Sequence, residues 1–140
     1  MRFVDTNVLL YAASTAEDER EKALRARDLL EAEDLALSVQ VLQEFYVQAT
    51  RPTRTQRLSH EQATGLVEAF LRFPVQDTTV ALVRAALETA SRFSVSYWDA
   101  AIIEAARGLG CATLLTEDLG DGTDFAGVRV VNPFTSRTQG

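Results

Sequence analysis

Short apolar runs alternate along this chain with longer segments in which apolar residues recur at helical spacing. The short runs predict strands at residues 3–4, 35–37, 74–76, 111–115 and 128–131. The longer segments predict a helical turn at residues 8–13 and helices at about 17–33, 39–47, 59–73, 78–92 and 94–110. Strands that alternate with helices imply a mainly parallel sheet with helices on both faces. We therefore expect an α/β fold with three layers, α/β/α.

Small polar residues that cap helix N-termini mark the expected helix starts. They are Thr15, Ser38, Ser59 and either Asp77 or Thr78. Gln62 follows Ser59 at the spacing that a capping box needs. The first long helix is expected to direct Leu24, Leu29 and Leu30 toward the core. These signals divide the chain into one domain at residues 1–134 and a flexible tail at residues 135–140.

The composition is that of a globular domain. The chain has 140 residues, of which 46% are hydrophobic and 24% charged, enough to bury one core. No apolar run approaches the roughly 20 residues of a membrane span, and the N-terminus lacks the pattern of a secretory signal. We therefore expect a cytoplasmic protein with no membrane contact. The single cysteine, Cys111, excludes an internal disulfide and a zinc cluster built on thiolates.

The net charge is −6 and the sequence pI is near 4.8. A chain with this charge does not bind nucleic acid broadly through its overall charge, although it can carry a local site. Arg51, Arg54 and Arg57 form such a local group in a segment that contains no acid. The segment is equally well explained as a loop that contacts RNA phosphates or as an ordinary exposed connection.

Two aspartates follow predicted strands, at the edge of a parallel sheet where ligands bind. Asp5 directly follows the strand at residues 3–4 and interrupts an apolar run, so its carboxylate needs a hydrogen bond, a charged partner or a cation. Asp118 follows the strand at residues 111–115. The carboxyl ends of parallel strands lie at one edge of the sheet, so the two acids are expected on the same edge.

Two further acids lie on helices that can approach this edge. Asp99 is aligned with Ile102 and Ile103 in the apolar stripe of its helix. Alternatively, Asp99 completes a capping box with Ser96 and bonds to the helix's own backbone amides. Glu44 lies at the margin of an apolar helix face, where a solvated surface glutamate is the simpler interpretation. The sequence leaves these alternatives open.

A cluster of carboxylates repels itself unless a cation neutralises it. Oxygen ligands without nearby cysteine or histidine favour Mg²⁺ or Mn²⁺ over zinc. One or two such ions activate water and stabilise a leaving oxygen, which is the chemistry of phosphodiester hydrolysis. The acids therefore indicate a metal-dependent nuclease, and this chemistry does not distinguish RNA from DNA.

Five fragments of the chain carry these residues, at 3–9, 43–45, 97–103, 115–119 and 128–134. They resemble the PIN-domain ribonucleases, in particular the VapC toxins of bacterial type II toxin–antitoxin modules. The similarity extends over nearly the whole chain. It implies a PIN-like α/β/α domain that binds Mg²⁺ or Mn²⁺ and cleaves single-stranded or loop RNA. It also implies a homodimer and a cognate antitoxin protein that blocks the site.

The resemblance assigns roles to individual residues. The acids that it makes catalytic are Asp5, Glu44, Asp99 and Asp118. Of these, the metal ligands are Asp5, Asp99 and Asp118. The residues that would orient the acids through hydrogen bonds are Thr6, Asn7 and Thr116. The acids that would replace or assist the fourth one are Glu117, Asp121 and Asp124.

Two other functions fit parts of this pattern. A PIN-like fold without activity would serve as an RNA-binding or protein-interaction module, although loss of at least one of the four acids would then be expected. A phospho-accepting receiver domain also gathers acids at a sheet edge, but it needs a lysine late in the chain, and Lys22 is the only lysine. We therefore expect a metal-dependent endoribonuclease that is the toxin component of a toxin–antitoxin system.

Overall fold

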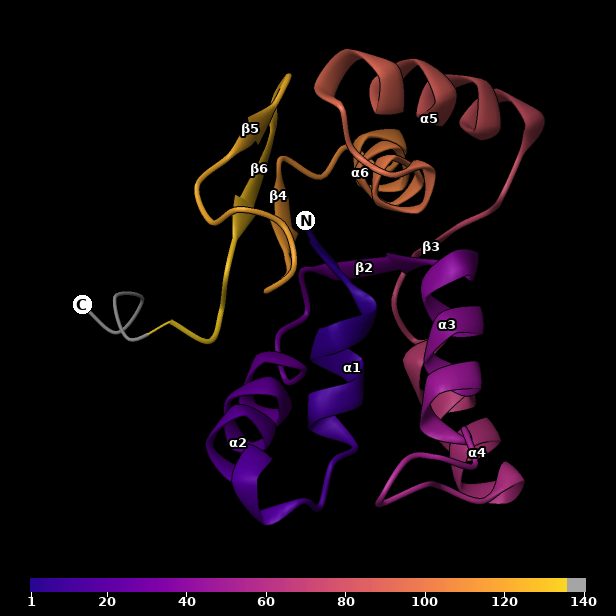
Figure 1. Cartoon of the computed structure of the whole chain (residues 1–140), viewed down its shortest axis with the longest axis vertical. Helices are drawn as coiled ribbons and strands as arrows, with labels where there is room; N and C mark the ends of the chain where they lie inside the picture. The colour runs from indigo at the N-terminus through magenta and orange to yellow at the C-terminus, as the bar shows by residue number, and fades with distance from the viewer. Residues whose placement is uncertain (136–140) are drawn as a thin grey trace.

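A single sheet of six strands runs through the computed structural model, which describes residues 1–135 (Figure 1). The spatial order of the strands is β3-β2-β1-β4-β6-β5. The parallel strands are β1 (Arg2–Val4), β2 (Leu35–Ser38), β3 (Val75–Gln76), β4 (Thr113–Leu115) and β6 (Val128–Val131). Strand β5 (Asp124–Phe125) pairs antiparallel with β6. The prediction of a mainly parallel sheet is confirmed.

Helices cover both faces of this sheet. Their bounds are α1 (Thr6–Ala12), the 3-10 helix η1 (Glu17–Glu19), α2 (Arg20–Leu29), α3 (Val39–Ala49), α4 (His60–Phe70), α5 (Val80–Phe93) and α6 (Tyr97–Gly108). Figure 1 shows α5 and α6 on one side of the sheet and α1 to α4 on the other. The domain therefore has the three α/β/α layers that the sequence predicts. No helix within residues 1–135 is long and apolar enough to cross a lipid bilayer.

The main core lies between the sheet and its helices. Phe3, Leu35 and Leu114, on strands β1, β2 and β4, are fully buried. Phe45 of α3 is also fully buried, and its ring packs edge to face against Phe70 of α4 with 5.1 Å between ring centroids. Strands β1 and β4 are adjacent and parallel in this sheet, so their carboxyl ends lie side by side. The candidate acids follow these two ends.

Two of the predicted helix starts are confirmed. The Ser38 side chain accepts a hydrogen bond from the Val41 amide and caps α3. Ser59 and Gln62 form the predicted capping box at the start of α4, with hydrogen bonds in both directions. In both cases the capping side chain bonds to an amide only three residues further on, so the local sequence is enough to predict the cap.

The other two predicted caps are wrong. Helix α5 is capped by Thr79, whose side chain accepts a hydrogen bond from the backbone, and not by Asp77 or Thr78. Thr15 caps no helix, because η1 begins after Ala16 without a side-chain cap. The Thr15 hydroxyl instead donates a hydrogen bond to the Gln56 side chain, which lies far along the sequence. Local sequence signals do not reveal such a partner.

The long helix predicted at residues 17–33 is shorter and is preceded by η1. Leu29 and Leu30 pack against the core as predicted, whereas Leu24 is 54% exposed. The buried positions of α2 are the small residues Ala23 and Ala26. The helix therefore packs on the core through its alanines. The prediction for Leu24 is wrong because it assumed that the larger apolar side chains mark the buried face.

The C-terminal part contains a strand that the apolar pattern does not predict. Strands β5 and β6 form a hairpin through Ala126 and Gly127, which have φ values of 52° and 102°. A strand of two residues is too short to show alternation. In the tail expected at residues 135–140, Thr135 donates a hydrogen bond to the Asn132 carbonyl, and residues 136–140 lie outside the described residues.

We predict that Phe45→Ala lowers the free energy of unfolding by about 3–5 kcal/mol, because it removes a fully buried ring and leaves a cavity beside α4. Val47→Ala on the same helix is the matched control, since Val47 is 56% exposed. Urea denaturation followed by circular dichroism measures both variants. Equal unfolding midpoints would contradict this description of the core.

Candidate functional site

Asp5 lies at the junction of β1 and α1, where it is the N-cap of α1. Its Oδ1 accepts a hydrogen bond from the Thr6 amide at 2.7 Å, and its Oδ2 accepts one from the Thr116 hydroxyl at 2.9 Å. These partners meet because Val4 and Leu115 are paired in the parallel ladder. The structure thus provides a hydrogen bond to each oxygen of a carboxylate that is only 8% exposed.

Burial raises the pKa of the Asp5 carboxyl to about 6. The hydrogen bonds from Thr6 and Thr116 lower this pKa, because they favour the charged form, and the carboxylates of Asp118 and Glu44 raise it. Interactions of this kind require the acids to be near one another. The structure therefore places three of the four predicted acids, Asp5, Glu44 and Asp118, in one electrostatic neighbourhood.

Asn7, Thr116 and Thr6 each contact these acids. The Asn7 side-chain amide donates to the Thr116 hydroxyl oxygen at 2.9 Å and to Asp118 Oδ2 at 3.1 Å. The Thr116 hydroxyl oxygen also accepts a hydrogen bond from the Asp118 amide at 3.1 Å. The Thr6 hydroxyl donates to Glu44 Oε1 at 3.3 Å. The side chains to which the resemblance assigns orienting roles therefore lie within hydrogen-bonding distance of acids.

Gln40 also lies in this region, although it was not among the predicted site residues. Its side-chain amide donates to Glu44 Oε1 at 3.3 Å and to the Trp98 carbonyl at 3.2 Å. It is buried on α3, and it links Glu44 to the first turn of α6, where Asp99 lies. A glutamine on the buried side of an amphipathic helix, one turn before an acid, is the signal that identifies it.

Asp99 is half-buried in the first turn of α6. Ser96 caps this helix by accepting a hydrogen bond from the Asp99 amide at 3.0 Å. The capping-box alternative fails because the Asp99 side chain does not return a bond to the helix backbone. Within residues 1–135 the Asp99 carboxylate has no hydrogen bond or ion pair, so it is free to contact a ligand.

The acids that follow β4 have different partners. Glu117 forms an ion pair with Lys22 at 2.9 Å. Asp121 and Asp124 each accept a hydrogen bond from a backbone amide near β6, at 2.9 and 2.6 Å. Only Asp118, among these four, also influences the pKa of Asp5 within the described residues. These contacts favour Asp118 as the fourth acid of the site.

The three arginines of the segment at residues 51–57 differ in their surroundings. Arg51 and Arg57 are exposed, whereas Arg54 is half-buried. The residues that line a small pocket together with Arg54 are Asn7, Leu10, Tyr11 and Glu19. Arg54 therefore lies close to a residue that contacts the acidic site, and the other two arginines face solvent.

The donors of the acidic site fit a hard divalent cation, because they are carboxylate, amide and hydroxyl oxygens. A cation would also relieve the repulsion by which Asp118 and Glu44 raise the pKa of Asp5. The acids are not assembled as a finished cage, however. Within residues 1–135, no group of three or more His, Cys, Asp or Glu side chains is arranged to hold a metal ion.

The parallel sheet and the acids at its carboxyl edge define an α/β/α protein with an acidic site. A family model for the PIN domain matches residues 2–124, so the chain belongs to the PIN domain family. No curated protein sequence matches the chain.

Several solved bacterial structures have a similar fold. A toxin–antitoxin complex from Klebsiella pneumoniae matches with a TM-score of 0.69 and 21% identity, over 96% of this chain and 98% of that chain. The Sarcin-Ricin loop cleaving toxin VapC20 from Mycobacterium tuberculosis matches with a TM-score of 0.67 and 20% identity, over 84% and 92%. DNA-bound VapBC from Salmonella typhimurium matches with a TM-score of 0.63 and 21% identity, over 93% and 96%. These likenesses show the fold.

We predict that Asp5 makes the metal-free protein less stable as the pH rises. Its pKa is about 6 in the folded protein against an ordinary value of 3.8, so the folded state binds the proton more tightly. The resulting stabilisation is complete below about pH 4 and is lost as the pH passes about 6, a change of about 3 kcal/mol.

Urea denaturation in EDTA, at intervals between about pH 4 and pH 7, measures this contribution as the difference between wild type and Asp5→Asn. The Asp28→Asn variant changes an exposed aspartate of α2 and should retain the wild-type dependence. The same pH dependence in wild type and Asp5→Asn would show that another group is responsible.

Proposed function

We propose that this protein is a metal-dependent endoribonuclease and the toxin of a VapC-type toxin–antitoxin module. The observation that carries the proposal is the hydrogen-bonded series Asp5, Thr116, Asn7 and Asp118 at the carboxyl edge of a PIN-domain sheet. A buried acid with a raised pKa among other carboxylates is typical of a functional site. Glu44 is held beside this series by Thr6 and Gln40.

The proposed metal ligands are Asp5, Asp99 and Asp118, and Glu44 completes the set of catalytic acids. The ion is Mg²⁺ or Mn²⁺, which when bound lowers the pKa of water and offsets negative charge on the phosphate. The protein's part is to hold its carboxylates in place. Thr116 and Asn7 do so for Asp5 and Asp118 through the hydrogen bonds described above.

The partners follow from the same proposal. One of the matching structures is named as a toxin–antitoxin complex, one as DNA-bound VapBC and one as a Sarcin-Ricin loop cleaving toxin. For this chain we propose an RNA substrate, a cognate antitoxin that blocks the acids, and a homodimer. We also propose a cytoplasmic location, where a toxin of this kind meets its RNA.

A catalytically inactive PIN-like module is the second candidate. It is favoured by the absence, within residues 1–135, of three acidic or other ligating side chains arranged to hold a metal ion. Such a module would bind RNA or a protein without cleaving it. The retention of the four acids, with two of them joined through Thr116 and Asn7, supports the enzyme instead.

We predict that purified protein cleaves a mixed RNA pool in Mg²⁺ or Mn²⁺ and not in EDTA. Asp5→Asn and Asp99→Asn should each reduce cleavage by about 100-fold or more, because each removes a charged ligand from the site. The exposed Asp28→Asn change is the matched control and should retain wild-type activity.

Gel analysis of the products measures cleavage, and a parallel DNA pool tests whether the substrate is RNA. Full activity in Asp5→Asn or Asp99→Asn would show that these residues are not the site. Absence of both cleavage and metal binding in the wild type would favour the inactive module.

We also predict that replacing Arg51, Arg54 and Arg57 with alanine weakens RNA binding and makes it less sensitive to salt. If two or three of these arginines each contact a phosphate, the slope of log affinity against log salt should become shallower by about 1.4 to 2. Fluorescence anisotropy with Asp99→Asn protein, which should not degrade the RNA, measures the slope. Arg84→Ala on α5 is the control. An unchanged slope in the triple variant would show that residues 51–57 do not contact the RNA phosphates.

A further inference from the structure

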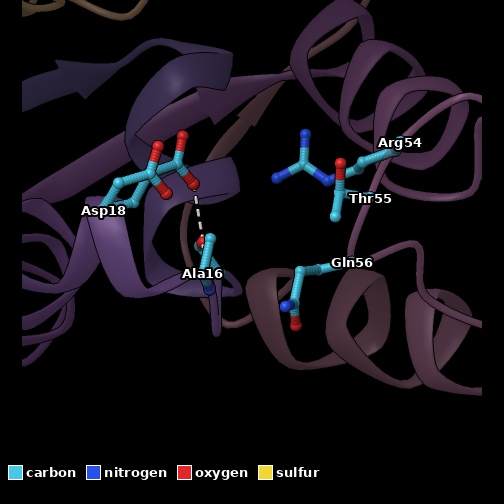
Figure 2. Close-up of a pocket in the computed structure, with 7 residues that line it drawn as sticks. Ala16, Asp18, Arg54, Thr55 and Gln56 are labelled. Carbon is cyan, nitrogen blue, oxygen red and sulfur yellow. Dashed lines mark hydrogen bonds between the residues drawn. The ribbon is translucent and has the colours of Figure 1, made fainter.

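A cleft with a volume of about 380 Å³ lies beside the acidic site. One wall is the segment that follows α1, and the other is the loop that precedes α4. The residues that line it are Ser14, Ala16, Asp18, Glu19, Arg54, Thr55 and Gln56. Figure 2 shows Arg54 and Thr55 across the opening from Asp18. The volume is within the range of sites that bind small molecules.

The cleft adjoins the acidic site through shared residues. Arg54 and Glu19 line both this cleft and the smaller pocket that Asn7 also lines. Asn7 in turn donates a hydrogen bond to Asp118 Oδ2 at 3.1 Å. An RNA strand with one phosphate at the acids would therefore bring a neighbouring nucleotide to Arg54 and to the mouth of the cleft.

The walls of the cleft are held by hydrogen bonds. The Ser14 hydroxyl, which is buried, donates to Glu19 Oε1 at 2.6 Å. The Thr15 hydroxyl donates to the Gln56 side chain and so joins the two walls. Glu19 is therefore a positioned carboxylate, and the distance between the walls is constrained by a direct contact.

The opposite charges of the two walls do not neutralise each other. Within residues 1–135 the Arg54 guanidinium forms no ion pair, although Asp18 and Glu19 line the same cleft. In Figure 2 the guanidinium projects into the opening toward the wall that carries Asp18. A guanidinium thus lies on one wall and two carboxylates lie on the other, and a ligand that contacts both must present acceptors and donors on different edges.

We propose that this cleft binds the base of a nucleotide next to the scissile phosphate and that it selects guanine. Guanine presents the acceptors O6 and N7, which arginine contacts in a bidentate manner, and the donors N1–H and N2–H₂, which a carboxylate accepts. Unstacked RNA bases are commonly read through such edges. Adenine and cytosine each offer one amino group and uracil offers one ring N–H, so none of the three presents a carboxylate with two adjacent donors as guanine does. The inference rests on the proposed ribonuclease function, whose sequence preference it specifies.

Binding is tested without cleavage by titrating 5′-GMP and 5′-AMP into the full-length protein in EDTA, with calorimetry as the measurement. The two nucleotides share their phosphate, so a difference in affinity reports the base. We expect GMP to bind about tenfold more tightly than AMP, and an Asp18→Asn, Glu19→Gln double variant to lose this difference. The Asp28→Asn control should retain it. Equal affinities in the wild type, or no binding of either nucleotide, would overturn the proposal.

Sequencing the cut ends of a mixed RNA pool provides the second test. Wild-type protein should enrich guanine at one position beside the cut, and the double variant should not. The two experiments separate the two proposals. Selective GMP binding by a protein that does not cleave RNA would support the cleft and reject the nuclease. Cleavage with no base preference would support the nuclease and reject the cleft as a guanine site.

Discussion

The hydrogen bond between the Thr116 hydroxyl and the buried Asp5 carboxylate is the interaction on which the acidic site depends. Asp5 directly follows a central strand and is buried, so water does not stabilise its charge and its two oxygens need protein donors. One donor is the first amide of α1, which makes the same carboxylate the cap of that helix. The other comes from the end of β4. A single residue therefore links the start of a helix to the ends of two strands.

Thr116 extends this constraint to the next acid because its hydroxyl has one proton to donate and lone pairs with which to accept. It donates to Asp5, and it accepts from the Asn7 side chain and from the Asp118 amide. These bonds together determine how the hydroxyl is oriented. Asn7 then contacts Asp118 directly. Valine at position 116 would have a similar shape but none of these bonds, so Thr116 is needed for its chemistry.

The sequence predicts those parts of the site that depend on residues close together along the chain. Apolar runs locate the strands, and the rule that ligands bind at carboxyl ends then places Asp5 and Asp118 on one edge. Gln40 was not predicted, because its role depends on a hydrogen bond to the Trp98 carbonyl, which lies 58 residues further along the chain. The wrong cap at Thr15 has the same cause, a partner that is distant in sequence.

The adjacent acids Glu117 and Asp118 show how the fold limits repulsion in the site. Glu117 is paired with Lys22, the chain's only lysine, and it also accepts a hydrogen bond from the Tyr11 hydroxyl. Asp118 instead contributes to the raised pKa of Asp5, and Glu117 does not. A further carboxylate without a cationic partner at this edge would raise that pKa more and oppose ionisation of Asp5. The cation that compensates Glu117 thus helps to keep Asp5 able to ionise near neutral pH, the form in which a carboxylate can bind a metal ion.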